Sequence, residues 1–508
     1  MTEATAASDA PSAAAASDAA GAGAVATVAG VAVDTRHWIG GERVGSAETF
    51  ADISPIDGTV IARVARGTAA DARAAVAAAR AAFPGWAATP PAERARILHA
   101  VADGVEKRLA DLAVVETTDN GALLRSHLRG VMPRVAHNMR FFADWLTDRL
   151  DHGDFDTRGH NNHVSWDPAG PCVLITPWNA PLMLATWKIG PALAAGNTVV
   201  LKPAEWTPLT ASLFADIAAE AGLPAGVFNV VQGYGAEVGA ALVEDPDVRR
   251  ISFTGSVPTA RAIGAAAGAN LTPTSFELGG KSPLLVFADA DLDLAADLAV
   301  EQYDNAGQVC LAATRILVEE SVAEEFTARF VARAAELVQG DPRDEATGIG
   351  PNIHADHLAR VDGFVTRAVD AGARVVVGGG PNTELGGLYY RPTLLTDVAQ
   401  DSEIVQEEVF GPVLTLQTFA DEEEAVTLVN DTRFGLAATV ATGDRDRADR
   451  VTARLVAGTV WVNCFFVRDL QAPFGGARQS GVGREGGTWS FDFYCDVKNT
   501  VTSPNGWH

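Results

Sequence analysis

Cysteine is scarce in this sequence: only Cys172, Cys310, Cys464 and Cys495 occur among 508 residues. They lie far apart and include no CxxC pair, so neither a disulfide framework nor a cysteine-based metal site is expected. We therefore expect a cytoplasmic protein with reduced thiols and no metal.

Basic residues and long apolar runs are also in short supply. Lysine and arginine number 39 against 64 aspartate and glutamate residues, and the formal net charge is −25. Because nucleic-acid backbones bind clustered basic side chains, a nucleic-acid partner is not expected. No apolar run reaches the roughly 18 residues of a membrane span, so a membrane partner is not expected either.

The chain has a low-complexity start and then regular structure. Residues 1–36 are rich in Ala, Ser, Gly and Asp, and we expect a disordered tail there. Further on, short β-like stretches at 38–44 and 54–64 precede helical patterns at 70–86, 91–121 and 132–149. The length allows two or three domains.

Strand-like and helix-like segments then alternate in two regions, 171–287 and 283–470. The first includes CVLITPW, NTVVLKPA, RRISFTGS and SFELGG as strands, and EVGAALVED (237–245) as one of the helices. Such alternation predicts βαβ units and parallel sheets covered by helices on both faces. The predicted fold class is α/β, with two domains.

Polar residues follow several of these strands, where parallel sheets bind ligands. They include Thr176 to Asn179, Lys202 with Glu205, and Thr254 to Ser256. Gly235 and Gly239 belong to a Gly-rich turn that departs from GxGxxG, so a plain structural turn competes with a nucleotide loop.

Two reactive residue types stand in unusual surroundings. Cys310 follows the polar run NAGQV, which fits either a half-buried structural thiol or a nucleophile. Glu277 lies between an apolar strand and two glycines, which fits either a turn cap or a general base in a partly dry cleft. These residues alone leave both choices open.

Six longer motifs carry a resemblance to a known family. They are PWNAPLMLATWKIGPALAAGNTVVLKPAEWTP, SFTGS, FELGGKSP, NAGQVC, EEVFGP and PFGGARQSGVGRE. In this order and spacing they resemble the NAD(P)-dependent aldehyde dehydrogenase superfamily, over about residues 38–501. The pair ELGGK and GQxC is highly specific and identifies Cys310 as the expected nucleophile.

The resemblance implies a fold and a division into domains. It implies a Rossmann-like parallel-sheet NAD domain (37–155 and 171–278), an α/β catalytic domain (279–487) and a β oligomerisation arm (156–170 and 488–508). The arm would combine NNHVSWDP with FDFYCDVKNTVT as strands. Strands on a projecting arm expose their edges, so a homodimer or homotetramer is expected.

The resemblance also implies catalytic roles. Cys310 would add to the aldehyde, the Asn179 side chain and the Cys310 backbone N–H would stabilise the oxyanion, and Glu277 would activate water to hydrolyse the thioester. Lys188 and Glu485 match positions sometimes assigned to a proton relay.

NAD is the implied cofactor, because the carboxylate of Glu205 would accept ribose hydroxyls and repel a 2′-phosphate. Ala260 departs from the usual Gly and could crowd helix–strand packing. The implied cofactor residues are Ile175, Thr176, Pro177, Trp178, Lys202, Glu205, Gly235, Gly239, Phe253, Thr254, Gly255, Ser256, Leu278, Glu408 and Phe410.

The stretch VNCFFVRDLQAPFGG resembles the branch that oxidises ring-cleavage semialdehydes, such as 2-hydroxymuconic and 5-carboxymethyl-2-hydroxymuconic semialdehyde. Arg134, Trp187, Arg468 and Phe474 would line the substrate channel, and the two arginines suit a substrate carboxylate. A structural ion pair of Arg468 with Asp469 is the competing interpretation. A betaine-aldehyde-type or broad aldehyde dehydrogenase, a CoA-acylating member and a non-catalytic relative are the alternative functions.

Overall fold

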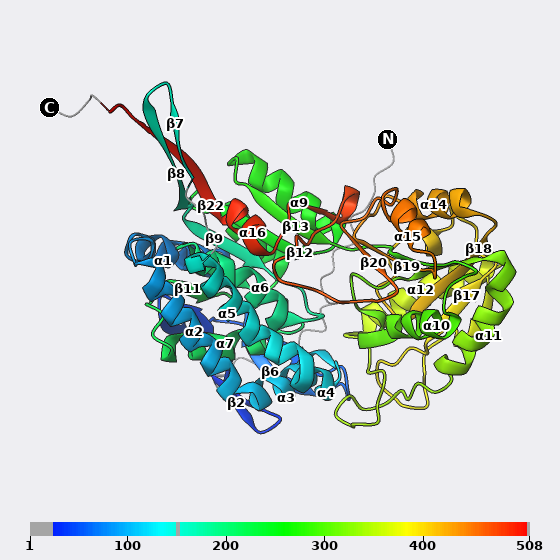
Figure 1. Cartoon of the computed structure of the whole chain (residues 1–508). Coiled ribbons are helices and arrows are strands. Elements are labelled where there is room, and N and C mark those ends of the chain that lie inside the picture. Colours follow the sequence, from blue (N-terminus) through cyan, green and yellow to red (C-terminus); the bar gives the residue numbers. More distant parts are fainter. Residues whose placement is uncertain (1–23, 149–152, 505–508) are drawn as a thin grey trace, which may run out of the picture.

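The computed structural model describes residues 24–148 and 153–504. Its first large sheet has eight strands (Figure 1). Their order is β21 (Gly481–Val482), β13 (Thr274–Leu278), β12 (Arg250–Gly255), β9 (Pro171–Ile175), β10 (Thr198–Lys202), β11 (Phe228–Val230), β3 (His37–Ile39) and β4 (Glu42–Val44). The five strands β13 to β11 are parallel, as the sequence predicts, whereas β21 and β3 join them antiparallel.

The second large sheet has seven strands. Their order is β16 (Arg374–Val377), β17 (Thr393–Thr396), β18 (Val413–Phe419), β15 (Arg315–Glu319), β14 (Pro283–Val286), β19 (Ala437–Ala441) and β20 (Thr459–Val462). Only the edge strand β16 runs antiparallel to its neighbour. The α/β fold class is therefore confirmed, with mixed rather than purely parallel sheets.

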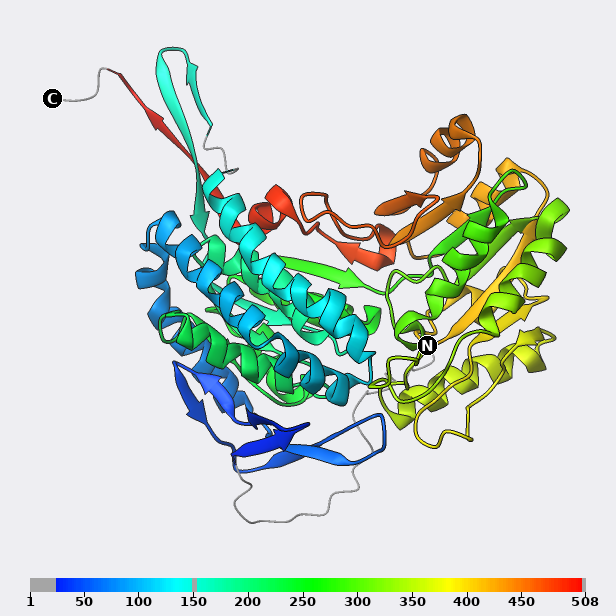
Figure 2. The same ribbon diagram turned by 60° about the horizontal axis from the view of Figure 1, so that its bottom comes forward.

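Both faces of the first sheet are covered by helices (Figure 2). Cys172 and Leu174 of β9 enter one apolar core, and Val173 and Ile175 enter the other, because successive strand residues point to opposite faces. The first core is completed by α2 (Pro91–Lys107), α3 (Leu109–Asn120), α5 (Met132–Asp148), α6 (Pro181–Ala194) and α7 (Leu209–Glu220). The second is completed by α1 (Ala69–Ala87), α8 (Ala240–Val243) and α9 (Val257–Ala269).

The second sheet is covered in the same way. Helices α10 (Leu292–Val300) and α11 (Ala323–Ala334) pack on one face, and α14 (Glu422–Asn430) and α15 (Arg445–Thr452) pack on the other. Helix α12 (Ala355–Asp370) packs near β17 and β18 together with the short α13 (Glu403–Gln406). The short helix α4 (Leu124–Ser126) precedes α5.

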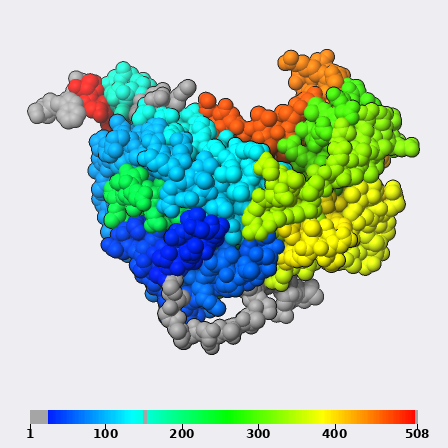
Figure 3. Space-filling model, turned by 90° about the horizontal axis from the view of Figure 1, so that it is seen from below, coloured from blue at the N-terminus to red at the C-terminus, as the bar shows by residue number. Residues whose placement is uncertain are grey.

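The predicted disordered tail is wrong in its last thirteen residues, 24–36. Strands β1 (Val25–Val28) and β2 (Val31–Asp34) form an antiparallel hairpin, and residues 1–23 lie outside the described part. Ala29 and Gly30 both have positive φ, 48° and 87°, as a two-residue hairpin turn requires. Val28 and Val33 are buried, so apolar contact stabilises a segment whose composition looked featureless. The hairpin of β5 (Thr49–Ile53) with β6 (Val60–Ala65) belongs to the same blue surface, which adjoins the yellow part of the chain in Figure 3.

Two other predicted segments differ. FDFY, predicted as part of an arm strand, lies in helix α16 (Gly487–Tyr494), because Phe491 and Tyr494, three residues apart, both enter the first core. The predicted helix 237–245 is a π-helical turn (Gly235–Gly239) followed by the single turn of α8.

A three-stranded sheet projects from the first large sheet (Figure 1). It contains β7 (Asp154–Thr157), β8 (His160–Pro168) and β22 (Cys495–Thr502), with β8 in the middle. Phe155, Val497 and Val501 are exposed on it.

Among the helices within 24–148 and 153–504, none is long and apolar enough to cross a membrane. The same residues contain no group of three or more His, Cys, Asp or Glu side chains that could hold a metal ion. All four cysteines are free thiols.

Candidate active site

The predicted cofactor residues lie where the strand order of the first sheet reverses. The chain passes from β9 to β10 and β11 in one direction, and β12 then returns to the other side of β9. Ligands of open α/β sheets bind at the carboxyl ends of strands flanking such a reversal. Those ends and the residues next to them contain Ile175, Thr176, Pro177, Lys202, Phe253, Thr254, Gly255 and Leu278.

Lys202 and Glu205 interact directly. The Lys202 ammonium donates to Glu205 Oε2 at 2.8 Å, and the Glu205 side chain keeps 18% of its surface exposed. Its second oxygen is therefore available for hydroxyl donors.

Other predicted cofactor residues are less closely tied to this crevice. Ser256 caps α9 by accepting from the Thr259 N–H at 3.4 Å. A Cβ added at Gly235 or Gly239 would meet nothing within 4 Å, so packing does not require glycine at either position. Ala260 is buried in the second core, where its methyl group packs.

The turn that precedes the predicted nucleophile has an unusual backbone. Asn305, Ala306 and Gly307 have consecutive φ angles of 51°, 55° and 69°. A Cβ at Gly307 would lie 2.2 Å from the Gly411 carbonyl oxygen, so only glycine fits this close approach. We call residues 305–310 the thiol turn. Gly307 lets the backbone pass close to Gly411 and continue to Cys310 at the end of the turn.

Hydrogen bonds tie the thiol turn to the predicted oxyanion residue. Asn179 Nδ2 donates to the Gln308 carbonyl at 2.9 Å, and Asn305 Nδ2 donates to the Asn179 carbonyl at 3.0 Å. A side-chain amide carries two N–H groups, so Asn179 keeps a second donor next to the thiol turn.

Electrostatic interactions place Cys310 in one site with three charged residues. Burial and the carboxylates of Glu408 and Glu277 together raise the pKa of the Cys310 thiol to about 12, and burial contributes most to this rise. The Arg468 guanidinium opposes it. The resting side chain is therefore a neutral thiol that must transfer its proton before it attacks.

Glu277 is a buried carboxyl group without a partner. Its side chain is 5% exposed, and neither carboxylate oxygen has a hydrogen-bond partner among the described residues. Burial raises its pKa well above the usual value, the charge of Glu485 raises it further, and Lys188 opposes the rise. An uncommitted carboxyl group of this kind fits a general base better than a turn cap.

The predicted relay residues form a buried network behind Glu277. The Lys188 ammonium donates to Glu485 Oε1 at 2.6 Å and to Ser252 Oγ at 2.9 Å. Ser252 Oγ in turn donates to Glu485 Oε1 at 3.2 Å. Ser252 was not predicted, because a serine within an apolar strand gives no sign of its distant partners.

Glu408 and Phe410 lie between the two sheets. Glu408 Oε1 accepts from the Gly280 N–H at 3.2 Å, and burial raises its pKa to about 7. Phe410 has a φ of 58°, and its ring centroid lies 5.2 Å from that of Trp178.

The predicted substrate residues come together around Arg468. Its guanidinium lies 3.7 Å from the Phe474 ring centroid and 5.1 Å from that of Trp187. Burial, and to a smaller extent the nearby charge of Arg134, lower the pKa of Arg468 to about 10. Arg134 itself donates to Asn138 Oδ1 at 3.2 Å. We call Arg134 and Arg468 the arginine pair.

The arginine pair has no carboxylate at ion-pair distance within residues 24–148 and 153–504. Asp469 acts on the pKa of Arg134 from farther away, and its Oδ1 accepts from the Gln471 N–H at 2.8 Å. The expected alternative, an Arg468–Asp469 ion pair, is therefore absent from the described residues.

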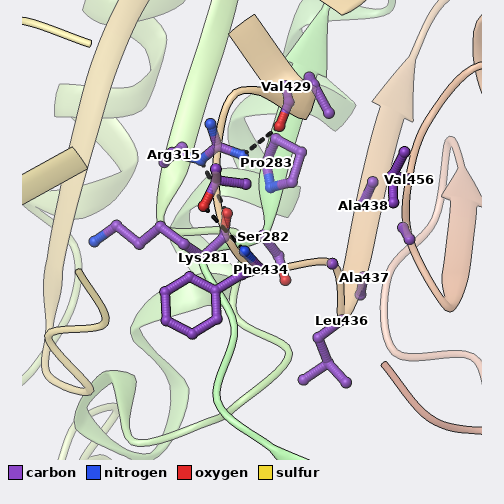
Figure 4. A pocket seen from close by; sticks show the side chains of 13 residues that line it. Lys281, Ser282, Pro283, Arg315, Val429, Phe434, Leu436, Ala437, Ala438 and Val456 are labelled. Carbon is purple, nitrogen blue, oxygen red and sulfur yellow. Dashed lines mark hydrogen bonds between the residues drawn. The ribbon is translucent and has the colours of Figure 1, made fainter. Parts of the chain in front are cut away.

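A small cavity lies next to the start of β14 (Figure 4). Arg315 lines it and donates to the carbonyls of Lys281 and Val429, each at 2.9 Å. None of the predicted catalytic residues lines it. We assign it a packing role.

Gln308, His354 and His357 also surround the site and were not predicted to act there. Gln308 Oε1 accepts from the Ile353 N–H at 3.0 Å, and His357 Nε2 lies 2.7 Å from the Phe410 carbonyl oxygen. NIHADH looks like an ordinary helix start, so these contacts depend wholly on tertiary structure.

Comparisons with known proteins give the family of this chain. The family model described as "Aldehyde dehydrogenase family" matches residues 43–500. The chain is 46% identical to 2-hydroxymuconic semialdehyde dehydrogenase of Pseudomonas sp. (strain CF600), over 92% of this chain and 99% of that protein. It is 42% identical to 5-carboxymethyl-2-hydroxymuconate semialdehyde dehydrogenase of Escherichia coli, over 89% and 98%.

Solved structures give the same result. An indole-3-acetaldehyde dehydrogenase complexed with NAD+ has a TM-score of 0.91 and 41% identity, over 93% of this chain and 97% of that chain. Betaine aldehyde dehydrogenase from Staphylococcus aureus, in complex with NAD+, has a TM-score of 0.91 and 37% identity, over 94% and 96%. The extent of these matches shows that this chain belongs to the aldehyde dehydrogenase family.

Proposed function

We propose that this protein oxidises an aldehyde to a carboxylic acid with NAD as the hydride acceptor. The observation that carries the proposal is the meeting of three groups: the Cys310 thiol, the second N–H of Asn179 and the unpartnered carboxyl group of Glu277. Glu277 accepts the thiol proton, and attack of the Cys310 sulfur on the aldehyde carbon then forms a C–S bond and an oxyanion, which Asn179 stabilises. NAD, when bound, accepts the hydride that this intermediate releases.

The thioester left on Cys310 then requires water. Glu277 removes a proton from that water, oxygen adds to the thioester carbon, and the C–S bond breaks to release the acid and restore the thiol. A base placed for hydrolysis disfavours a CoA-acylating role, and the intact Cys310, Asn179 and Glu277 disfavour a non-catalytic one. Lys188 and Glu485 are proposed to pass on the proton that Glu277 gains.

NAD fits the residues present. Glu205 keeps an oxygen free at the carboxyl end of β10, where ribose hydroxyls would donate to it, and a 2′-phosphate there would meet its negative charge. Glu408 and Phe410 are proposed to bind the nicotinamide ribose and ring. The NAD+ complexes of the structural relatives support this choice.

The proposed substrate is a semialdehyde that carries a carboxylate, as released by aromatic ring cleavage. Two guanidinium groups without an ionic partner face the same site as Cys310, and a carboxylate would neutralise both. The names of the two semialdehyde dehydrogenase relatives support this substrate class. A cationic betaine aldehyde would instead be repelled by the pair.

NADH formation with matched anionic, neutral and cationic aldehydes tests the proposal. We expect the highest kcat/KM with the anionic semialdehyde and the lowest with the cationic one. Preference for the neutral aldehyde would favour a broad aldehyde dehydrogenase, and an absence of NADH with every aldehyde would favour a non-catalytic relative.

The remaining proposals concern the domains, assembly and location. We propose the division into NAD domain, catalytic domain and arm given above, with pairing of arm edges in a homodimer or homotetramer. The exposed Phe155, Val497 and Val501 support such pairing, because apolar side chains on a free edge favour association. Light scattering that shows a monomer at micromolar concentration would contradict it. The four free thiols support a cytoplasmic location.

A further inference from the structure

The start of α12 contacts one end of the proposed cofactor site through a ring stack. The His354 ring lies on the Trp206 ring, with centroids 4.0 Å apart and an interplanar angle of 14°. Trp206 directly follows Glu205, the proposed partner of the adenosine ribose. Because His354 belongs to the catalytic part and Trp206 follows β10 of the first sheet, the stack joins the two parts of the molecule.

The same helix start contacts the other end of the site. His357 is 7% exposed, and its ring centroid lies 5.4 Å from that of Trp178. Its Nε2 lies 2.7 Å from the Phe410 carbonyl oxygen. A carbonyl only accepts, so the imidazole carries its proton on Nε2 and donates. This bond fixes the residue whose positive φ places the Phe410 ring beside Trp178.

The two histidines are also fixed relative to each other and to the thiol turn. His354 Nδ1 accepts from the His357 N–H at 3.1 Å, so His354 is the N-cap of α12. The Ile353 N–H donates to Gln308 Oε1 at 3.0 Å. Gln308 belongs to the thiol turn and also accepts from Asn179. Residues 353–357 therefore touch the adenosine side, the nicotinamide side and the catalytic turn at once.

We propose that His354 and His357 are positioning residues for the cofactor. They fix the separation between the Glu205–Trp206 segment, which holds one end, and Phe410, which holds the other. The Glu205–Trp206 segment and Phe410 belong to different parts of the chain and are linked through residues 354–357. This link sets the distance that a bound dinucleotide must span. This inference rests on the proposed NAD-dependent function.

Four variants separate the stack from the helix cap. His354→Asn keeps a side chain that caps helices but removes the ring, whereas His354→Phe keeps the ring and removes the cap. Trp206→Leu removes the other ring of the stack. Trp489→Leu is the matched control, because this tryptophan is 41% exposed on α16 and takes no part in the stack.

The readout is the NAD dissociation constant of the full chain without aldehyde, measured by calorimetry. His354→Asn and Trp206→Leu are each expected to raise it about two- to tenfold, the value of an aromatic pair. The double variant is expected to match the singles, because both remove one stack. His354→Phe and Trp489→Leu should stay within about twofold of wild type. Steady-state kinetics should show a raised KM for NAD with an unchanged KM for the aldehyde.

Tryptophan emission gives an independent signature, since removal of the His354 ring should change the emission of the cofactor-free protein. Wild-type affinity for NAD in both single variants, additive losses in the double variant, or parallel increases in both KM values would each overturn the positioning role. Failure of the wild-type protein to bind NAD would instead overturn the proposed function, and the inference with it.

Discussion

The thiol turn and the arginine pair serve one proposed substrate but are held in different ways. The turn is fixed by its backbone: three consecutive residues have positive φ, and Asn179, Asn305 and Gln308 make hydrogen bonds within and around it. The arginine pair is fixed by side-chain contacts, which are ring stacking for Arg468 and one hydrogen bond for Arg134.

This difference separates chemistry from selectivity. A backbone-defined turn would act on every aldehyde in the same way, because in the proposed reaction it would contact only the reacting carbon and oxygen. The arginine pair would contact the rest of the proposed substrate, so its side chains could change the preferred aldehyde while the reaction stays the same. Changes in the turn should therefore lower activity towards all aldehydes equally, and changes in the pair should not.

Replacement of the nucleophile should give the largest effect. Cys310→Ala is expected to lower kcat by at least about four orders of magnitude with anionic and neutral aldehydes alike, because no covalent intermediate can form. NAD binding should stay near wild type, since the thiol lies among groups proposed to act on the aldehyde. Stopped-flow NADH absorbance and calorimetry measure the two quantities. Cys172→Ala is a matched control, because that thiol lies on β9 and is buried in the first core.

Glu277→Gln should slow the second half of the reaction by about two to four orders of magnitude, the usual contribution of a general base. NADH is then expected in a burst of up to one equivalent per site, followed by slow turnover. The base works only when ionised, and its pKa is raised, so the rate of hydrolysis in wild type should climb with pH above the usual glutamate range. That rise should disappear in the variant. Unchanged steady-state rates across pH would show that Glu277 is not the base.

Asn179→Ala should have the next largest effect, about two to three orders of magnitude in kcat, because one oxyanion donor is lost. The loss should be equal for anionic and neutral aldehydes. The variant also removes a bond to Gln308, so a crystal structure is the control for the position of the turn. A loss confined to anionic aldehydes would contradict the role of Asn179 as an oxyanion donor, because that pattern is expected of the arginine pair.

The sequence predicted the two regions unequally. Strand ends and the thiol turn were located because short motifs such as FELGGKSP and NAGQVC specify local geometry and chemistry together. The absence of an Arg468–Asp469 ion pair, the role of Ser252 and the contacts of His354 and His357 depend on residues distant in sequence, so no local pattern announces them. The N-terminal hairpin was missed for a related reason: its stability comes from burial of Val28 and Val33 rather than from composition.

The arginine pair should give the smallest and most selective effect. Hydrogen bonds to charged groups are worth about 1.5–3 kcal/mol, so Arg468→Ala and Arg134→Ala should each lower kcat/KM for an anionic semialdehyde about ten- to a hundredfold.

A neutral aldehyde of equal length should lose less than about threefold in either variant, since it forms no bond with a guanidinium group. Arg140→Ala is the matched control: Arg140 lies on α5 like Arg134, but it is paired with Asp103 and Glu106 at the surface. Equal losses with anionic and neutral aldehydes would mean that the arginine pair supports the local structure and does not bind the substrate. The thiol turn and the arginine pair would then differ only in how they are held in place. The preferred aldehyde would have to be set by other residues around Trp187 and Phe474.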